Sequence, residues 1–348
     1  MPKLRRGNRQ RQWRILTRYQ STLQGVLDRA LYAYAMGLSL RDLQELLYVF
    51  VGHILSHTAV NRITLAVQDI MTTWRSQPLE ATPPVLLVDG VWVKILYPTG
   101  QTWTDASGHV RQEVRGEERV ILAGLAVWPD GRHAILHYEV AVAETQDTWA
   151  TFLTHLRERG LDPSGLQLVV SDGTHGLLEA MAQHLPQTAS QRCTEHKARG
   201  LERYLTYQTL PTVDATTGQP LSESQARHQR HAEILHEARE VFQAPTETEA
   251  RQRLESFETK WTPLEPKAVH NFTWGLKRCF TFYQFPDELH VLIRSTNLLE
   301  RFFQEFRTKA DEIGAFPNED SGLTIFYLVM VREHAKHDRV DFAKTERH

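Results

Sequence analysis

The stretch "VLLVDGVWVKI", residues 85–95, decides the fold of this 348-residue chain. Its apolar half, VLLV, follows two prolines and ends at Asp89 and Gly90. A short apolar run bounded in this way is typical of a strand that is buried on both faces. An ionised carboxylate at the end of such a strand is costly unless a cation or hydrogen bonds compensate it. Asp89 is therefore the first candidate for a functional residue.

The segments after this strand predict a sheet with helices packed on it. Two more strand-like runs follow directly, and a turn at Pro129–Gly131 separates them, so the first three strands form an antiparallel meander. A helix, a fourth strand and another helix come next. The two strand-like runs are residues 119–131 and 132–143, and the fourth strand is 166–173. The two helices are 145–160 and 175–185. Three strands, a helix, a strand and a helix predict an α/β fold with a mixed sheet covered by helices.

A second aspartate repeats the pattern of the first. Asp172 ends the run "LVVS" and is followed by Gly173, as Asp89 is followed by Gly90. Two carboxylates at the ends of strands in one sheet repel each other unless a divalent cation lies between them. Asp-Gly is also a common turn pair, and for either dipeptide alone the turn is the better explanation. The two together favour a metal site, with the turn as the alternative.

The segment "IRSTNLLERFFQEFRTK", residues 293–309, offers a third carboxylate, Glu300. At about 100° per residue, the bulky apolar side chains share one arc of a helix and Glu300 lies on the opposite arc. The apolar arc contains Leu298, Leu299, Phe302, Phe303, Phe306, Ala310 and Ile313. Glu300 is the candidate third ligand, and the alternative is a solvated helix face with ordinary ion pairs.

The N-terminal part of the chain carries a weaker signal for DNA binding. Residues 21–78 predict helices, with starts at Ser39 and Ser56, which fits a helix-turn-helix that presents Asn61 and Arg62 to DNA. Any small helical bundle gives the same pattern. Residues 1–20 contain several basic residues, among them Arg5 and Arg6, and no acidic one. Such a cluster binds phosphates or is a solvated tail.

Length and composition set the limits of the other inferences. The chain is long enough for two or three domains, and we expect boundaries of 1–80, 81–200, 201–290 and 291–348, the third being an all-helical insertion. Two cysteines, without a secretory signal or an apolar run of membrane-spanning length, predict a cytoplasmic protein with no disulfide framework and no membrane. The net charge of -2 does not by itself suggest nucleic-acid binding. Cys193 and His196 have the spacing of half a zinc site, but no second half follows, so we expect a structural or positioning role.

Five segments resemble the Mutator-type transposases, the group that includes many bacterial insertion-sequence enzymes. The strongest are "SDGTHGLLEAMAQHLPQTASQRCTEHKARGL" (171–201) and "IRSTNLLERFFQEFRTKADEIGAFPNEDS" (293–321). The others are "YAMGLSLRDLQELL" (34–47), "LSHTAVNRI" (55–63) and "PLEATPPVLLVDGVWVKI" (78–95). The resemblance runs through most of the chain. Two departures are a short N-terminal region, which suggests an N-terminally shortened copy, and Gly90, where a larger residue is usual.

The resemblance implies an RNase H-like core with a DDE triad at Asp89, Asp172 and Glu300. It also implies two Mg²⁺ or Mn²⁺ ions, cleavage and strand transfer at transposon ends, and a homo-oligomer on paired ends. The DNA partners would be terminal inverted repeats and target DNA. The resemblance further implies that Arg301, Arg307 and the N-terminal arginines bind phosphates. Cys193 and His196 would support the core. Trp261 or Trp274 would correspond to a tryptophan of the insertion domain.

Three other functions compete with this one. The first is a DNA-binding regulator derived from a transposase, without catalysis, although all three acids are present. The second is an RNase H-like nuclease that cuts but does not join DNA. The third is a non-catalytic helical scaffold with incidental Asp-Gly turns.

Overall fold

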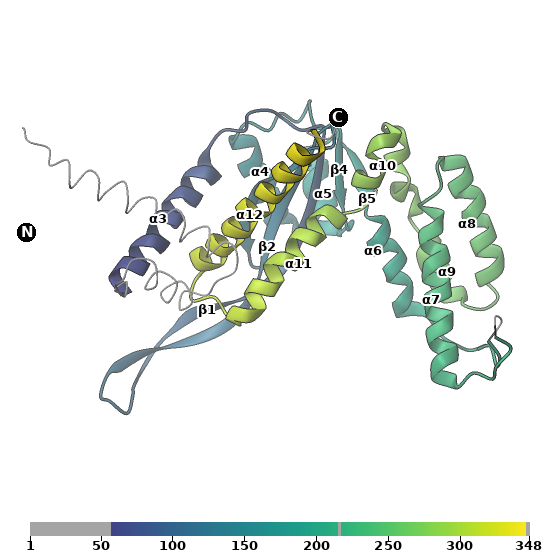
Figure 1. The fold of residues 1–348 in the computed structure, drawn as a ribbon, viewed down its shortest axis with the longest axis horizontal. Coiled ribbons are helices and arrows are strands. Elements are labelled where there is room, and N and C mark those ends of the chain that lie inside the picture. The colour runs from purple at the N-terminus through teal and green to yellow at the C-terminus, as the bar shows by residue number, and fades with distance from the viewer. Residues whose placement is uncertain (1–56, 215–216, 346–348) are drawn as a thin grey trace, which may run out of the picture. The chain divides into compact units, whose positions relative to one another are not determined.

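The computed structural model describes residues 57–214 and 217–345 (Figure 1). The chain divides into two compact units. Residues 75–323 form the larger unit, which holds the sheet, and the described part of the smaller unit comprises residues 57–74 and 324–345. The five strands are β1 (Val85–Thr104), β2 (Val110–Val127), β3 (His133–Ala141), β4 (Leu168–Ser171) and β5 (Ala189–Arg192).

The five strands form one mixed sheet in the order β3-β2-β1-β4-β5. The strands β1, β2 and β3 are antiparallel neighbours, whereas β4 is parallel to β1 and β5 is parallel to β4. The predicted meander and mixed sheet are thus confirmed. The fifth strand was not predicted, because its sequence, ASQR, has no apolar run and only Gln191 within it is buried.

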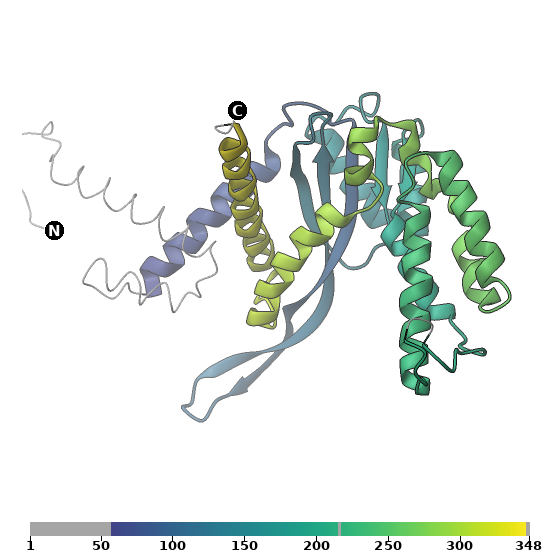
Figure 2. The ribbon, with the colours of Figure 1, turned by 45° about the vertical axis from the view of Figure 1, so that its right-hand side comes forward.

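Both faces of the sheet are covered, as the apolar run VLLV predicts. Leu86 and Val88 pack with α4 (Gln146–Glu158) and α5 (His175–His184) in one apolar core. Val85 and Leu87 point to the opposite face and are also fully buried. The ribbon views show α4 and α5 behind the sheet and α11 (Asn297–Ile313) in front of it (Figures 1 and 2). The part of β1 that leads to Asp89 therefore lies between two covered faces.

The strands β1 and β2 extend beyond the sheet as a two-stranded ribbon (Figure 2). Sequence patterns ended the first strand at residue 95 and began the second at 119, because the ribbon residues are polar and exposed. Near the base of the ribbon, the backbone of Phe316 pairs with β1: its N–H donates to Lys94 and its carbonyl accepts from Leu96, both over 2.8 Å. This pairing attaches the chain after α11 to the central strand.

A second apolar core, which runs from residue 198 to residue 280, overlaps most of the predicted helical stretch 201–290. Its helices are α6 (Thr194–Arg199), η1 (Gly200–Tyr204), α7 (Glu223–Val241), α8 (Glu247–Trp261) and α9 (Pro266–Thr273). The chain then returns through η2 (Leu276–Cys279), η3 (Thr281–Gln284) and α10 (Asp287–Ile293) to α11. Trp261 is 1% exposed inside this core, whereas Trp274 is 68% exposed. Of the two tryptophans considered from sequence, only Trp274 is available to a ligand.

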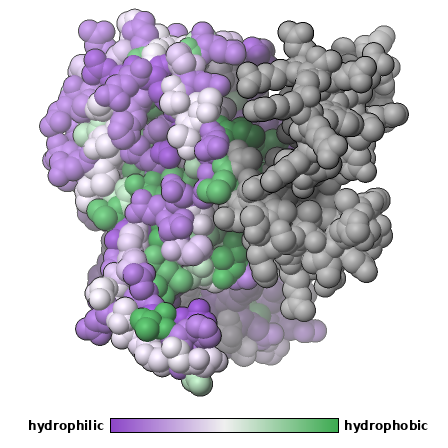
Figure 3. All heavy atoms as spheres, turned by 90° about the vertical axis from the view of Figure 1, so that its left-hand side faces the viewer, coloured by the Kyte–Doolittle hydropathy of each residue, from purple (hydrophilic) through white to green (hydrophobic). Residues whose placement is uncertain are grey.

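The described part of the smaller unit consists of helical segments. Residues 57–74 belong to α3 (His57–Ser76) and residues 324–345 to α12 (Glu319–Thr345). Val67, Tyr327 and Leu328 pack together. Asn61 and Arg62 lie in α3, whereas Arg5, Arg6 and the helix predicted from Ser39 lie outside the described residues. The predicted helix-turn-helix therefore stays a prediction. On the face drawn in Figure 3, the described residues are mostly hydrophilic, with hydrophobic patches among them.

Buried Gln191 joins β5 to the returning chain, and its removal should destabilise the larger unit. Its amide donates to the carbonyl of Cys279 over 3.0 Å, and its side-chain oxygen accepts from the N–H of Phe282 over 3.0 Å. Because Gln191→Ala leaves these groups buried without partners, we expect a loss of roughly 2 to 4 kcal/mol in the free energy of unfolding. Thermal or denaturant unfolding measures the loss. Gln183→Ala, an exposed change in α5, is the control, and equal stability of the two variants would contradict the account.

Candidate active site

The parallel pairing of β1 with β4 sets the two predicted aspartates at one level of the sheet. Leu87 pairs with Val170 at the last position of the ladder, and Asp89 and Asp172 each follow two residues later. Neighbouring strands lie about 4.8 Å apart, so residues at one level are close. The structure thus brings Asp89 and Asp172 together just beyond the segment over which the two buried strands pair.

The turn alternative holds for one aspartate and not for the other. Asp172 leaves β4, and its Oδ1 accepts the N–H of Thr174 over 3.0 Å, as in an Asx turn. Asp89 lies inside β1, which continues through Gly90 for the rest of the ribbon. Its Oδ1 accepts the N–H of Gly90 over 2.8 Å. A turn therefore does not explain Asp89.

Burial and neighbouring acids hold Asp89 partly protonated near neutral pH. The pKa of Asp89 is raised from 3.8 to about 7, chiefly by desolvation and in smaller part by the negative charges of Asp172 and Glu144. The Gly90 hydrogen bond and the charge of His196 lower the pKa but do not offset the burial. A group of acids that raises the pKa of a member in this way is stabilised by a bound cation.

Glu144 is an acid at this edge that sequence reasoning missed. It precedes Thr145, the N-cap of α4. A Cβ placed on Gly90 would lie 3.0 Å from its Oε1 and 2.6 Å from Val120 Cγ2, so the Glu144 carboxylate passes directly over position 90. Burial, followed by the charge of Asp172, raises the pKa of Glu144. The sequence "AETQDT" gave no signal, because an acid near a helix start normally faces solvent.

The unusual Gly90 now has a physical reason. The space that a side chain would take there is filled by Val120 and Glu144. The expectation from sequence was that glycine merely replaces a larger residue at a strand end. In this chain a larger residue would displace the Glu144 carboxylate or Val120.

Glu300 lies in the first turn of α11 and contacts a different set of residues. Its Oε1 accepts a hydrogen bond from Thr296 Oγ1 over 3.1 Å. His196 Nδ1 lies 3.7 Å from the same oxygen, and Arg199 Nη2 lies 3.6 Å from Oε2. The Glu300 side chain is 26% exposed and lies near two cationic residues, so the ligand role and the alternative of a helix face with ordinary ion pairs both stay predictions. The other predicted residues of this helix, Arg301 and Arg307, are exposed.

The structure groups Glu300 with the Cys-x-x-His pair. Potential ligand atoms of Cys193, His196 and Glu300 all lie within 4.8 Å of one another. The predicted trio of Asp89, Asp172 and Glu300 is not among the groups that meet this distance in the described part of the chain. Burial raises the pKa of Cys193, so its sulfur is a neutral thiol, which accepts hydrogen bonds from the N–H and hydroxyl of Thr296.

His196 links the two groups of acids. Its charge lowers the pKa of Asp89 and of Glu144, and its Nδ1 faces Glu300. That nitrogen is buried and has no hydrogen-bond partner within the described residues. Asp89, Asp172 and Glu144 offer carboxylate oxygens, which are the ligand atoms that Mg²⁺ and Mn²⁺ prefer. The acids at this edge therefore fit a divalent cation of that class.

A second cluster, His137, Glu139 and His155, also has ligand atoms within 4.8 Å. Glu139 Oε2 lies 3.1 Å from His137 Nε2 and 2.5 Å from His155 Nδ1. The other nitrogen of His137 faces the guanidinium of Arg159 at 3.4 Å, so it serves as an acceptor and Nε2 carries the proton. A histidine that binds metal through Nε2 must donate its other N–H, which Arg159 opposes. This cluster is a hydrogen-bonded anchor of α4 on β3.

The pattern of the family described as "Transposase, Mutator family" matches residues 1–217 and 222–339. The chain belongs to the Mutator family of transposases. The resemblance found in the sequence is thereby confirmed. In the described part of this Mutator-family chain, no helix is long and apolar enough to span a membrane.

Named relatives of this Mutator-family chain are transposases of insertion sequences. The "Transposase for insertion sequence element IS905" of Lactococcus lactis subsp. lactis is 27% identical over 83% of this chain and 63% of its own length. The "Transposase for insertion sequence element IS256 in transposon Tn4001" of Staphylococcus aureus is 25% identical over 92% of this chain and 73% of its own. The chain thus spans less than two thirds of the first relative.

A solved structure, the "Drosophila P element transposase strand transfer complex", aligns with 91% of this chain and 80% of its own chain. The identity is 12% and the TM-score is 0.33. A score at this level does not establish a common fold.

The raised pKa of Asp89 predicts a pH-dependent penalty in the metal-free protein. A carboxyl whose pKa is higher in the folded state adds stability below its unfolded pKa, and that stability is lost as pH rises through about 7. At pH 8, Asp89→Asn should therefore unfold with a free energy roughly 2 to 4 kcal/mol higher than wild type, and the gain should shrink towards pH 4. Denaturant unfolding in EDTA at both pH values measures it.

Asp130→Asn is the control for this prediction. The Asp130 carboxylate pairs with Arg132 Nε on the surface at 2.5 Å, and this contact lowers its pKa. Its replacement should bring no gain at pH 8. A constant difference between Asp89→Asn and wild type from pH 4 to pH 8 would contradict the account of Asp89.

Proposed function

We propose that this chain is a DNA transposase that cuts and joins strands at transposon ends through Asp89, Asp172 and Glu300. The observation that carries the proposal is the parallel β1–β4 pair, which sets the two aspartates at one level of the sheet. The alternative of a non-catalytic scaffold does not account for buried, mutually repelling acids at this edge. Membership of the Mutator family supports the same function.

The strand order supports an RNase H-like core. In the sheet β3-β2-β1-β4-β5, three antiparallel strands come first and two parallel ones follow. The helical segment between β5 and α11 interrupts this core, in keeping with the proposed boundaries near residues 200 and 290. The proposal places the catalytic acids on β1, after β4 and on the first helix after the insertion.

Asp89, Asp172 and Glu300 would hold two Mg²⁺ or Mn²⁺ ions, with Glu144 beside them. Such ions, when bound, activate a water or 3′-hydroxyl and stabilise the leaving oxygen of the phosphodiester. The residues of the chain supply the setting for this chemistry. Asp89 must release the proton that it retains near neutral pH. The charge of His196 lowers the pKa of Asp89, and the Nδ1 of His196 faces Glu300. Thr296 fixes the Glu300 carboxylate by a hydrogen bond.

The proposed partners are terminal inverted repeats and target DNA, bound by a homo-oligomer on paired ends. Arg301 and Arg307 are exposed on α11 and would contact phosphates, which positions DNA without reading its sequence. Asn61 and Arg62 on α3, with Arg5 and Arg6, are the other proposed DNA contacts. Replacing any arginine that binds a phosphate should make DNA binding less dependent on salt, because fewer counterions are then released.

The test uses the purified chain and a duplex carrying the inverted repeats that flank its gene. With Mg²⁺ or Mn²⁺, wild type should nick the repeat end and join it to a second duplex. Asp172→Asn should bind the duplex with the affinity of wild type, while cleavage falls by about a thousandfold or more. Gel analysis of labelled strands separates nicked from joined products.

Asp130→Asn, an exposed acid in the β2–β3 turn, is the matched control and should cleave normally. Cleavage without joining would assign the chain as a nuclease, and binding without cleavage in either metal would assign it as a regulator. Full activity of Asp172→Asn would contradict the proposed triad.

A further inference from the structure

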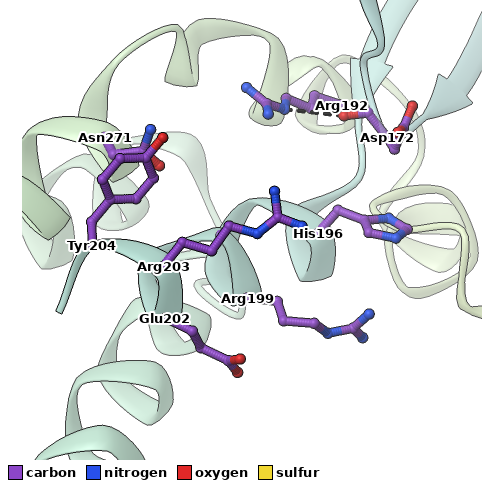
Figure 4. A pocket seen from close by; sticks show the side chains of 9 residues that line it. Asp172, Arg192, His196, Arg199, Glu202, Arg203, Tyr204 and Asn271 are labelled. Carbon is purple, nitrogen blue, oxygen red and sulfur yellow. Dashed lines mark hydrogen bonds between the residues drawn. The ribbon is translucent and has the colours of Figure 1, made fainter.

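A cavity of about 370 Å³ opens beside Asp172 (Figure 4). Its walls come from the end of β4, from β5 and α6, and from the helical insertion. The lining residues are Asp172, Arg192, His196, Arg199, Gly200, Glu202, Arg203, Tyr204 and Asn271. The volume is near the lower end of the range for small-molecule pockets, about 300 to 1,000 Å³. This size is in keeping with one nucleotide.

Three arginines give the cavity an excess of positive charge. Arg192 donates from Nε to the backbone carbonyl of Asp172 over 3.2 Å, which leaves its terminal nitrogens for a ligand. Arg199 lies 3.6 Å from Glu300. Arg203 forms no hydrogen bond or ion pair within the described part of the chain, and Figure 4 shows its side chain extending towards the middle of the lining residues. Arginines arranged in this way recognise phosphate.

The side of the cavity away from Asp172 offers contacts for a base. Tyr204 is 43% exposed and ends η1. Figure 4 shows it together with Asn271 on one side, with Asp172 and Arg192 on the other. Lys197 Nζ donates to the backbone carbonyl of Asn271 over 2.7 Å and to that of Trp274 over 2.8 Å. These bonds hold the backbone, so the Asn271 amide stays available.

We propose that this cavity binds one unpaired nucleotide next to the phosphodiester held at Asp172. The Tyr204 ring would stack on the base, the Asn271 amide would bond to its edge, and Arg203 with Arg192 would hold the adjoining phosphate. A ring for stacking beside cations for the backbone is how proteins bind single-stranded nucleic acid. The inference rests on the proposed function, since it takes the substrate to be DNA. It adds that the strand is unpaired beside the cleavage position.

Binding in EDTA tests this without relying on cleavage. Two labelled duplexes carry the inverted repeat, and one has a single unpaired nucleotide at its outer boundary. Wild type should bind the bulged duplex more tightly than the paired one. Tyr204→Ala should lower the affinity for the bulged duplex by about fivefold to a hundredfold and leave that for the paired duplex unchanged, because the stacking on the base is removed. Tyr204→Phe keeps the ring and should keep the preference.

Two further pairs of variants sharpen the test. Arg203→Ala should weaken binding of both duplexes and lower the salt slope by about one, whereas Arg157→Ala, an exposed arginine on α4, should not. Trp274→Ala should keep the preference for the bulged duplex. If Trp274→Ala abolished it and Tyr204→Ala did not, the cavity would not be the binding site. If wild type cleaves DNA but binds both duplexes equally, the nucleotide site would be overturned and the proposed function would stand. If wild type prefers the bulged duplex but does not cleave DNA, the proposed function would be overturned and the nucleotide site would stand.

Discussion

The parallel pairing of β1 with β4 is the constraint on which the candidate site depends. Residues 85–88 of β1 and residues 168–171 of β4 are buried, so the two runs lead to a low-dielectric edge of the sheet. Asp89 and Asp172 leave this edge at one level, and Glu144 approaches from the start of α4. Burial, and then the charge of Asp172, raise the pKa of Asp89 and of Glu144, which is costly for an apo fold and favourable for one that binds a cation.

Contacts within the larger unit hold both ends of α11, the helix that carries Glu300. The rings of Phe306 and Phe316 stack with a centroid distance of 6.2 Å, and Phe316 is in turn paired with the backbone of β1. At the other end of the helix, Thr296 donates to the sulfur of Cys193. The contacts support the predicted positioning role of Cys193, while the Nδ1 of His196 faces Glu300 and its charge lowers the pKa of Asp89. After the insertion, the chain thus returns to Thr296, beside Cys193.

Sequence patterns were sufficient where burial and periodicity agree. The apolar runs before Asp89 and Asp172 predicted their strands, and the phenylalanine arc predicted the buried face of α11. The same patterns could not find β5, which is polar and held by Gln191, or the exposed ribbon of β1 and β2. Glu144 and the cavity at Tyr204 depend on contacts between distant segments, which no local pattern records. The contact of Glu300 with His196 and Arg199 is of the same kind.

Iron-mediated cleavage of the backbone tests the metal site most directly. Fe²⁺ can replace Mg²⁺ in oxygen-rich sites, and with peroxide and ascorbate it cuts the chain beside the bound ion. Our account predicts fragments that end next to Asp89 and Asp172, suppressed by excess Mg²⁺ and absent in Asp89→Asn. Cuts confined to the neighbourhood of His137 and Glu139 would contradict it, because the only bound ion would then lie at the cluster that we assign as a hydrogen-bonded anchor.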